Sequence, residues 1–424
     1  MKAEARTHAQ PRRDRTANAR GLSGAIAWRN LWRNRRRTLL SVSAIAFSVA
    51  LLTFSMAMQA GTYQTMIDNA TRLLDGHLQI QRRGYRDDPR VENAIHDMAD
   101  RVAAVRATAG VTAATPRIAA FALVSGDERS YGAQLLGVDP AGERALSSLP
   151  HMLAEGRYLV SGAEAYAGQV LARNLAVSVG EQIVVLGTTS NGGVAALTAT
   201  LVGTFASGIA ELDRQLIEVS IATVADAFEM PDAAHAIVVR TESVDRSTRV
   251  AEALRSVVPA NEVVLEWPAL IPDLEQAIML DKASGSMVFG ILAAVVTIGV
   301  LNAFVMTVFD RTREFGMLLA MGMRARAVIG LLQIEALLLS GIGCVVGLAI
   351  GIPLVLWLSR VGISFGDANA AVRAFHITDR LYPALSAAAI VRPVVLMMVC
   401  AQLAALLPAL RVRRIQPVEA LRAA

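Results

Sequence analysis

The residues best suited to a specific interaction lie in one short connector, from Asp310 to Gly322. It reads Asp-Arg-Thr-Arg-Glu-Phe-Gly-Met-Leu-Leu-Ala-Met-Gly, so basic and apolar side chains are interleaved over the length of a short amphipathic helix. A basic, amphipathic segment of this kind is suited to binding a partner. We expect it to contact a partner in the cytoplasm.

No other part of the chain shows the spacing of a common catalytic or metal site. A nucleotide-binding P-loop needs a glycine directly before a lysine, so that the lysine reaches the phosphates. The chain has two lysines, Lys2 and Lys282, and neither is preceded by glycine. The six histidines are scattered, and neither HExxH nor a paired CxxC occurs. Cys344 and Cys400 lie in apolar segments and are expected to pack as small core side chains. We expect no catalytic residue, no metal site and no directly bound cofactor.

Two long apolar segments flank the connector. No charged residue occurs between Lys282 and Asp310, and Glu335 is the only one between Arg326 and Arg360. Each segment exceeds the roughly 20 apolar residues that a membrane helix needs. The connector therefore joins two predicted transmembrane helices.

Glu335 lies inside the second of these segments. An ionisable group in hydrocarbon costs at least about 2.5 kcal/mol unless it faces protein or water, so Glu335 needs a partner. Its place near the start of the segment puts it within reach of the connector arginines. Two interpretations stay open, namely a latch between the span and the connector or a structural hydrogen bond between helices.

Composition indicates a membrane protein with a sizeable polar part. Of the 424 residues 54% are hydrophobic and 18% charged, and the mean hydropathy is +0.44, above what a soluble enzyme usually shows. The formal net charge of +5 comes from arginines clustered beside apolar segments, at 33–37, 311–326 and 411–414, so it indicates membrane topology and argues against a nucleic-acid partner. If four helices cross alternately, all three clusters face the cytoplasm.

The predicted fold is α-helical and membrane-spanning, with four transmembrane helices and a large periplasmic α+β domain inserted between helices 1 and 2. The predicted segments are a cytoplasmic tail and interfacial helix (1–38), transmembrane helix 1 (39–60), the periplasmic domain with a two-helix stalk (61–284), transmembrane helix 2 (285–310), the connector (311–326), transmembrane helix 3 (327–359), a periplasmic loop (360–390), transmembrane helix 4 (391–410) and a cytoplasmic tail (411–424).

The α+β prediction rests on alternating patterns in the inserted segment. Short β-rich runs occur at 77–81, 118–124, 131–138, 182–186, 197–205, 216–221 and 236–239. Helical patterns span Val91 to Thr108 and Val244 to Val257. In the third span Gly343, Gly347 and Gly351 recur every four residues, which predicts close helix packing, more often within one bundle than at a dimer seam.

Several of these motifs together resemble one family, the macrolide-exporter and lipoprotein-releasing (mechanotransmission) permeases of ABC transporters. The matching stretches are Arg311-x-Arg313-Glu314-Phe315-Gly316-x3-Ala320-Met321-Gly322, then Glu335-Ala336, Gly341-x-Gly343-x3-Gly347, Leu201 to Phe205 with Val179 to Glu181, Ile271 to Lys282, and the tail from Pro408 to Arg422. The lipoprotein-releasing branch is the most similar. The resemblance covers nearly the whole chain from Trp28 onward.

The resemblance implies that the connector is a coupling helix, with Arg311, Arg313, Glu314, Phe315, Gly316, Ala320, Met321 and Gly322 docking on a separate ATPase subunit. The chain would then be a non-catalytic permease of the inner membrane of a Gram-negative bacterium. Its implied partners are two ATPase copies that bind ATP and Mg²⁺, a second permease that is the same or homologous, and a lipid or lipoprotein substrate.

The same resemblance suggests an acyl-chain path along the first two spans, lined by Phe47, Phe54, Phe289, Val296 and Phe304, although ordinary packing would also explain these residues. A periplasmic carrier or adaptor is a further candidate partner. The hairpin Gly187 to Gly193 is short where one lipoprotein-releasing subunit carries a longer hook, which counts against direct hand-off to a carrier. Alternatives are a signalling permease that activates a periplasmic partner, and an exporter of small molecules or peptides.

Overall fold

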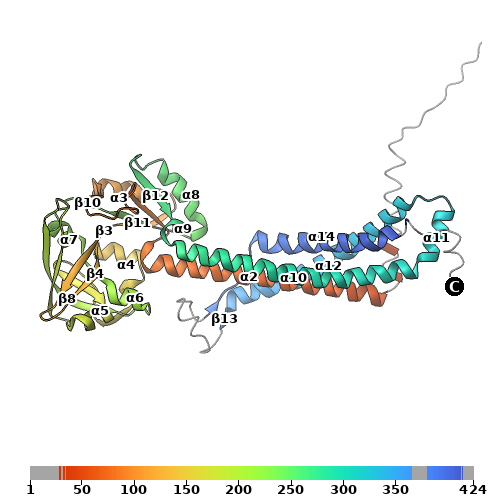
Figure 1. The fold of residues 1–424 in the computed structure, drawn as a ribbon, viewed down its shortest axis with the longest axis horizontal. Coiled ribbons are helices and arrows are strands. Elements are labelled where there is room, and N and C mark those ends of the chain that lie inside the picture. Colours follow the sequence, from red (N-terminus) through yellow and green to blue (C-terminus); the bar gives the residue numbers. More distant parts are fainter. Residues whose placement is uncertain (1–27, 30–31, 34, 365–379, 412, 414–424) are drawn as a thin grey trace, which may run out of the picture. The chain divides into compact units, whose positions relative to one another are not determined.

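The computed structural model describes residues 28–29, 32–33, 35–364, 380–411 and 413 (Figure 1). Most of the predicted N-terminal tail and interfacial helix, and nearly all of the C-terminal tail, lie outside these residues. The chain divides into two compact units. The first comprises residues 1–62, 280–363 and 381–424, and the second comprises residues 63–279 with 364 and 380.

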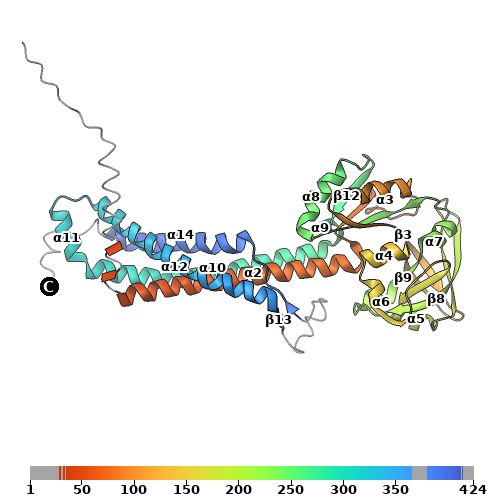
Figure 2. The same ribbon diagram turned by 180° about the vertical axis from the view of Figure 1, so that it is seen from behind.

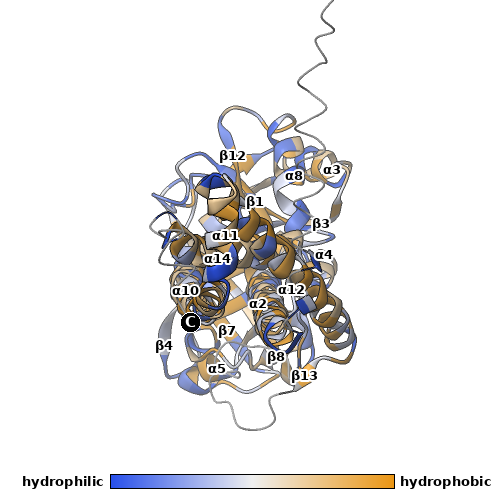
Figure 3. Cartoon of the chain, turned by 90° about the vertical axis from the view of Figure 1, so that its right-hand side faces the viewer, coloured by the Kyte–Doolittle hydropathy of each residue, from blue (hydrophilic) through white to orange (hydrophobic). Residues whose placement is uncertain are grey.

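Long apolar helices make up the first unit. They are α2 (Arg35–Ala70), α10 (Pro272–Asp310), α12 (Ala325–Val361) and α14 (Ala387–Arg411), with the short helix α11 (Thr312–Ala320) between α10 and α12. The four long helices are apolar and long enough to cross a membrane, and hydrophobic residues dominate them in Figure 3. Each predicted span lies within one of them, so the prediction of four membrane helices is confirmed at that level.

Helices α2 and α12 pack closely through the predicted glycine face. A Cβ atom on Gly347 would lie 2.6 Å from the carbonyl oxygen of Ala46, and one on Gly343 would lie 2.7 Å from Ile45, both on α2. Gly351 faces Ala50 in the same way. The face is therefore used for packing inside the bundle, as the spacing predicted.

The second unit contains an α+β fold in which α2 ends and α10 begins. A π-helical turn η1 (Thr71–Asp75) extends α2, and the following elements are β1 (Leu78–Arg82), β2 (Ile95–His96), α3 (Met98–Arg106), β3 (Val111–Ser125), β4 (Ser130–Val138), α4 (Pro140–Leu146), η2 (Leu149–His151), β5 (Leu153–Gly156), β6 (Glu164–Gly168), α5 (Gln169–Leu175), β7 (Gln182–Thr188), β8 (Val194–Phe205), α6 (Ala210–Gln215), β9 (Leu216–Ser220), α7 (Ile221–Ala227), β10 (Ala233–Ala234), β11 (Ala236–Thr241), α8 (Val244–Arg255), β12 (Glu262–Glu266) and α9 (Trp267–Leu270). Two short strands, β13 (Ile363–Ser364) and β14 (Arg380–Leu381), pair with each other.

A ten-stranded mixed sheet holds this fold together (Figure 2). The strand order is β12-β1-β11-β3-β4-β9-β6-β8-β5, and β7 pairs with β3 and β8. All seven predicted β-rich runs fall on strands of this sheet, with shifted ends. The helix predicted over Val91 to Thr108 is wrong in its first half: only Met98 to Arg106 is helical, because Ile95 and His96 pair with β10 and Asp97 has a positive φ of 55°.

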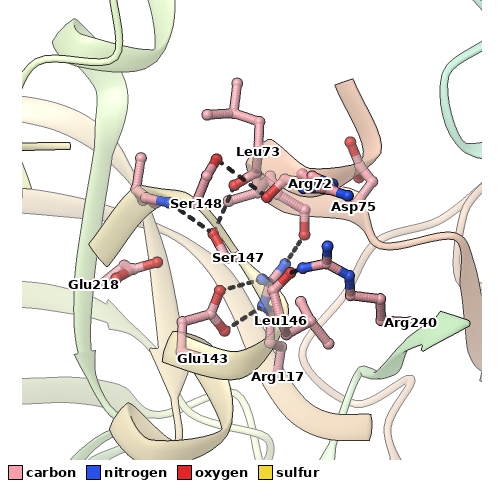
Figure 4. Close-up of polar contacts among 12 residues, drawn as sticks. Arg72, Leu73, Asp75, Arg117, Glu143, Leu146, Ser147, Ser148, Glu218 and Arg240 are labelled. Atoms are coloured by element: carbon pink, nitrogen blue, oxygen red, sulfur yellow. Dashed lines mark hydrogen bonds and ion pairs between the residues drawn. The ribbon is translucent and has the colours of Figure 1, made fainter. Parts of the chain in front are cut away.

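Charged residues occupy the core of the sheet near its middle strands (Figure 4). Arg117 of β3 and Glu143 of α4 form a two-pronged ion pair, and they are only 5% and 0% exposed. Glu218 of β9 is also fully buried and accepts a 3.0 Å hydrogen bond from the hydroxyl of Tyr158. Burial, followed by the nearby Glu143 carboxylate, raises the pKa of Glu218 to about 8, against the opposing charge of Arg117 and the Tyr158 bond.

Replacing Gly347 by leucine is expected to separate α2 from α12, because the new side chain has no space there. Gly341→Leu is the matched control, since a Cβ atom at Gly341 meets nothing within 4 Å on the same helix. Size-exclusion profiles after heating in detergent measure the effect. Equal thermal stability of the two variants would contradict the packing described here.

The raised pKa of Glu218 predicts a pH-dependent stability of the α+β unit. The unfolded carboxyl loses its proton near pH 4.5 and the folded one near pH 8, so folding retains a proton between these values and stability falls as pH rises through this window. Glu218→Gln, which carries no titrating proton, is expected to keep β9 amides protected at pH 8, where the parent chain loses protection. Amide exchange compared at equal pH measures this. Exposed Glu155→Gln is the control, and identical pH profiles for all three proteins would exclude the effect.

Candidate coupling site

The connector begins where α10 ends, and Arg311 is the residue that breaks the helix. Its φ of −110° and ψ of 15° separate α10 from α11. The side chain turns inward and is only 8% exposed. Because a buried guanidinium needs partners for its donors, its contacts determine how the connector is held.

Arg311 joins the connector to the third span. Its Nε donates to Glu314 at 2.9 Å, and Nη1 donates to Glu335 of α12 at 3.1 Å. Its guanidinium also lies 5.3 Å from the ring centre of Phe315. The buried carboxylate of Glu335, which is 6% exposed, therefore has Arg311 as its hydrogen-bond partner. Whether this pair acts as a latch remains a prediction.

Two arginines near the start of α2 contact the connector from the other side. Arg33 donates to Glu314 at 2.6 Å, and Arg37 donates to Asp310 at 3.1 Å. Burial raises the pKa of Glu314, but hydrogen bonds from Arg311 and Arg33 outweigh burial, so the net pKa lies below its usual value and the group stays a carboxylate. Glu314 thus bridges the chain before the first span and the connector.

One face of α11 is buried against the ends of the spans. Phe315 is fully buried and packs with Val308, Val328, Leu332 and Ala409, which come from α10, α12 and α14. Gly316 is buried beside it. These two residues and Arg311 were expected to dock on a partner. The structure buries all three inside this chain, where they anchor α11, and docking of the connector itself stays a prediction.

The opposite face of α11 is exposed and carries flexible methionines. Met317, Met321 and Met323 are 46%, 75% and 41% exposed, and Arg313 and Ala320 are also exposed. Methionine adapts its shape to a partner surface. We name this surface, formed by Arg313, Met317, Ala320, Met321 and Met323, the methionine face.

Gly322 ends α11 in a tight turn. Its φ is +89°, its amide donates to Leu319, and the amide of Met323 donates to Leu318, both at 3.0 Å. This pair of bonds is a Schellman motif, which favours glycine at the left-handed position. The motif fixes Met321 and Met323 at the exposed end of the helix.

The five residues of the suggested acyl-chain path are not brought together. Phe304 is 4% exposed in the bundle core, which Phe289 and Val296 also contact. Phe54 packs in a different cluster, and Phe47 is 68% exposed. Among the described residues no three His, Cys, Asp or Glu side chains gather as a metal site would require.

The arginines before the first span were interpreted as topology signals and as anchors of an interfacial helix, so Arg33 and Arg37 were not predicted as members of this site. Their partners, Glu314 and Asp310, lie 281 and 273 residues away in the sequence. The excess of arginine at 33–37 was the available signal, but no local pattern pairs it with particular carboxylates.

Two family descriptions match the chain. Residues 38–257 match the MacB-like periplasmic core domain, and residues 286–417 match the FtsX-like permease C-terminal region. Together with the four membrane helices and the connector, they define the class: the chain belongs to the MacB-like and FtsX-like permeases of ABC transporters. It is a bacterial membrane protein of that family, as the motifs predicted.

Relatives of this class include the lipoprotein-releasing system transmembrane protein LolC of Xylella fastidiosa strain 9a5c, which is 26% identical over 95% of this chain and 98% of its own length. The macrolide export ATP-binding/permease protein MacB of Nitrosomonas europaea is 38% identical, over only 22% of this chain and 15% of its own length. A crystal structure of the periplasmic region of MacB from Actinobacillus actinomycetemcomitans aligns at 12% identity with a TM-score of 0.36, covering 50% of this chain and 98% of that chain.

Removing Arg311 is expected to loosen α11, because Glu335 would lose its partner while still buried. Breaking one side of a buried ion pair costs about 3–5 kcal/mol. Arg311→Met should therefore speed amide exchange in α11, and adding Glu335→Gln should restore much of the protection. A double variant no better than the single one would show that the two side chains do not act as a pair.

Proposed function

We propose that this chain is the permease subunit of an inner-membrane ABC transporter of a Gram-negative bacterium. It couples ATP hydrolysis in a separate subunit to the extraction of a lipidated substrate, most plainly a lipoprotein. The observation that carries the proposal is the connector: α11 is anchored to three spans on one face and presents the methionine face on the other.

This arrangement would allow α11 to transmit a movement of the ATPase subunit to the membrane helices. Force applied to the methionine face passes through Phe315 to α10, α12 and α14, and through Glu314 to the chain that precedes α2. The chain has no P-loop lysine. ATP and Mg²⁺ are therefore assigned to the partner ATPase, present in two copies beside a second permease.

The choice of a lipoprotein rests on the relatives. Two relatives that match along 95% of the chain are named for lipoprotein release, whereas relatives named for macrolide and pyoverdine export match 86 to 145 residues. Over those short stretches the identity reaches 40%. Export of a small molecule is therefore the second candidate, and the mechanism at the connector would be the same.

The coupling proposal is tested by placing negative charge on the methionine face. Arg313→Glu and Met321→Glu should weaken binding of the co-purifying ATPase subunit and lower its stimulated ATP hydrolysis about tenfold, because both side chains are exposed on that face. Exposed Arg129→Glu, in the α+β unit, is the matched control. Normal stimulation by both connector variants would overturn the coupling role.

The substrate class is tested in the same reconstituted complex. Photocrosslinkers at Phe54 and Phe289 should capture a diacylated lipopeptide during ATP turnover. Capture of phospholipid alone, with coupling intact, would remove lipoprotein release and leave export of another substrate.

A further inference from the structure

The end of α2 inside the α+β unit is held in an unusual way. Helix α2 is continuous from Arg35 to Ala70, and η1 carries it on to Asp75. The last four carbonyl oxygens of a helix have no partner within the helix. Here every carbonyl from Thr71 to Asp75 accepts a hydrogen bond, and four of the five receive it from side chains or loops beyond the helix end. Figure 4 shows Ser147 and Ser148 beside Arg72 and Leu73.

The bonds at this end are as follows. Thr71 O accepts from Gly76 N at 2.8 Å, Arg72 O from Ser148 N at 2.8 Å and Ser148 Oγ at 3.3 Å, Leu73 O from Ser147 Oγ at 2.7 Å, Leu74 O from the Arg117 guanidinium, and Asp75 O from Gln79 Nε2 at 2.9 Å. We name Gln79, Arg117, Ser147 and Ser148 the α2 clamp.

Three of the four clamp residues are fixed near the middle of the sheet, and Gln79 lies on β1, next to the edge strand β12. Arg117 belongs to β3, a 15-residue strand flanked by β11 and β4, and its side chain is paired with Glu143 of α4. Ser147 and Ser148 directly follow α4, and Ser147 is 3% exposed. The chain after α4 is tied to β11 as well, since Arg240 donates to Leu146 O at 3.3 Å.

Helix α10 leaves the same unit from a different place. It follows α9 and β12, and β12 is the terminal strand of the sheet. A side-chain bond there runs from Arg86 to Leu270 O at 3.1 Å. The end of α2 is thus joined mainly to β3 and α4, near the middle of the sheet, whereas the start of α10 is joined through an edge strand.

We propose that the α2 clamp makes α2 the driving helix of the α+β unit: displacement of α2 is passed through several hydrogen bonds, most of them partly buried, to β3 and α4, while α10 acts as the compliant connection. This inference rests on the proposed function, in which nucleotide-driven movement reaches α2. The clamp residues are positioning residues, because they act through the backbone of the helix and contact no substrate.

The physical basis is the number and burial of the bonds. A single exposed hydrogen bond exchanges readily with water and transmits little force. Here several bonds, three of them partly buried, hold one helix end and must break together before that end can slip. Arg117 Nε donates to Glu143 Oε2 at 3.1 Å, and both side chains are buried. This ion pair holds the guanidinium in position for its hydrogen bond to Leu74 O.

The test is nucleotide-dependent amide exchange in the reconstituted complex of full-length chain and ATPase subunit. In the parent protein, a non-hydrolysable ATP analogue should change exchange rates in α2 and also in α4 and β3. In Ser147→Ala the change in α4 and β3 should fall about fivefold, the ratio expected for loss of one buried hydrogen bond. ATP hydrolysis should stay within twofold, since the connector is untouched.

Further variants distinguish loss of movement transfer through the α2 clamp from general destabilisation of the α+β unit. Arg117→Met with Glu143→Leu removes the Leu74 contact together with both members of the ion pair, a replacement that proteins often tolerate, and it should also reduce the response. Ser147→Thr keeps the hydroxyl and should restore it. Ser190→Ala is the control, because Ser190 Oγ donates to Glu229 O at 2.8 Å on another segment, outside the clamp.

The outcomes are distinct. A normal nucleotide response of α4 and β3 in both clamp variants would overturn the inference, and so would a parent complex in which nucleotide changes α2 alone. In either case stimulated ATP hydrolysis would leave the proposed function standing. A chain that neither binds nor stimulates the ATPase would remove the proposed function, and the inference with it.

Discussion

The structure depends first on how buried charge is paired beside the membrane. Arg311 interrupts the long run of apolar residues and turns inward, where Glu335 and Glu314 accept its hydrogen bonds. A guanidinium in this position is stable only with such partners. The pairing fixes the turn between α10 and α11, so it decides which face of the connector is anchored and which remains exposed.

The same principle recurs at the other end of α2. Arg117 and Glu143 bring an ion pair into the core of the sheet, and the arginine uses a remaining donor to bind the end of the helix. Both arginines therefore connect a long helix to a neighbouring element, Arg311 through two carboxylates and Arg117 through a backbone carbonyl at the helix end. A transporter that works by movement needs firm connections of this kind more than it needs reactive groups.

The relatives establish the class of protein, whereas the packing of the membrane helices bears on the substrate. The family match covers both the α+β segment and the membrane helices, so the class of protein is firm. The substrate is a finer question. Phe304 packs in the bundle core while Phe47 is exposed, so the aromatic residues of the first two spans do not form one continuous lining within this chain.

The sequence by itself determined the features that depend on local pattern. Four spans follow from apolar length, the glycine face of α12 from a four-residue repeat, and the position of α11 from the charged break at Asp310 to Arg313. Such features are visible because neighbouring residues create them.

Only the tertiary structure decided which residues of the connector face inward and which distant residues meet. Phe315 and Gly316 looked like docking residues but are buried, and Arg33 reaches Glu314 across 281 positions. The helix expected from Val91 begins only at Met98, because pairing with β10 outweighed local preference. The α2 clamp was likewise hidden in the sequence, because hydrogen bonds between segments far apart in the chain leave no periodic pattern in either segment.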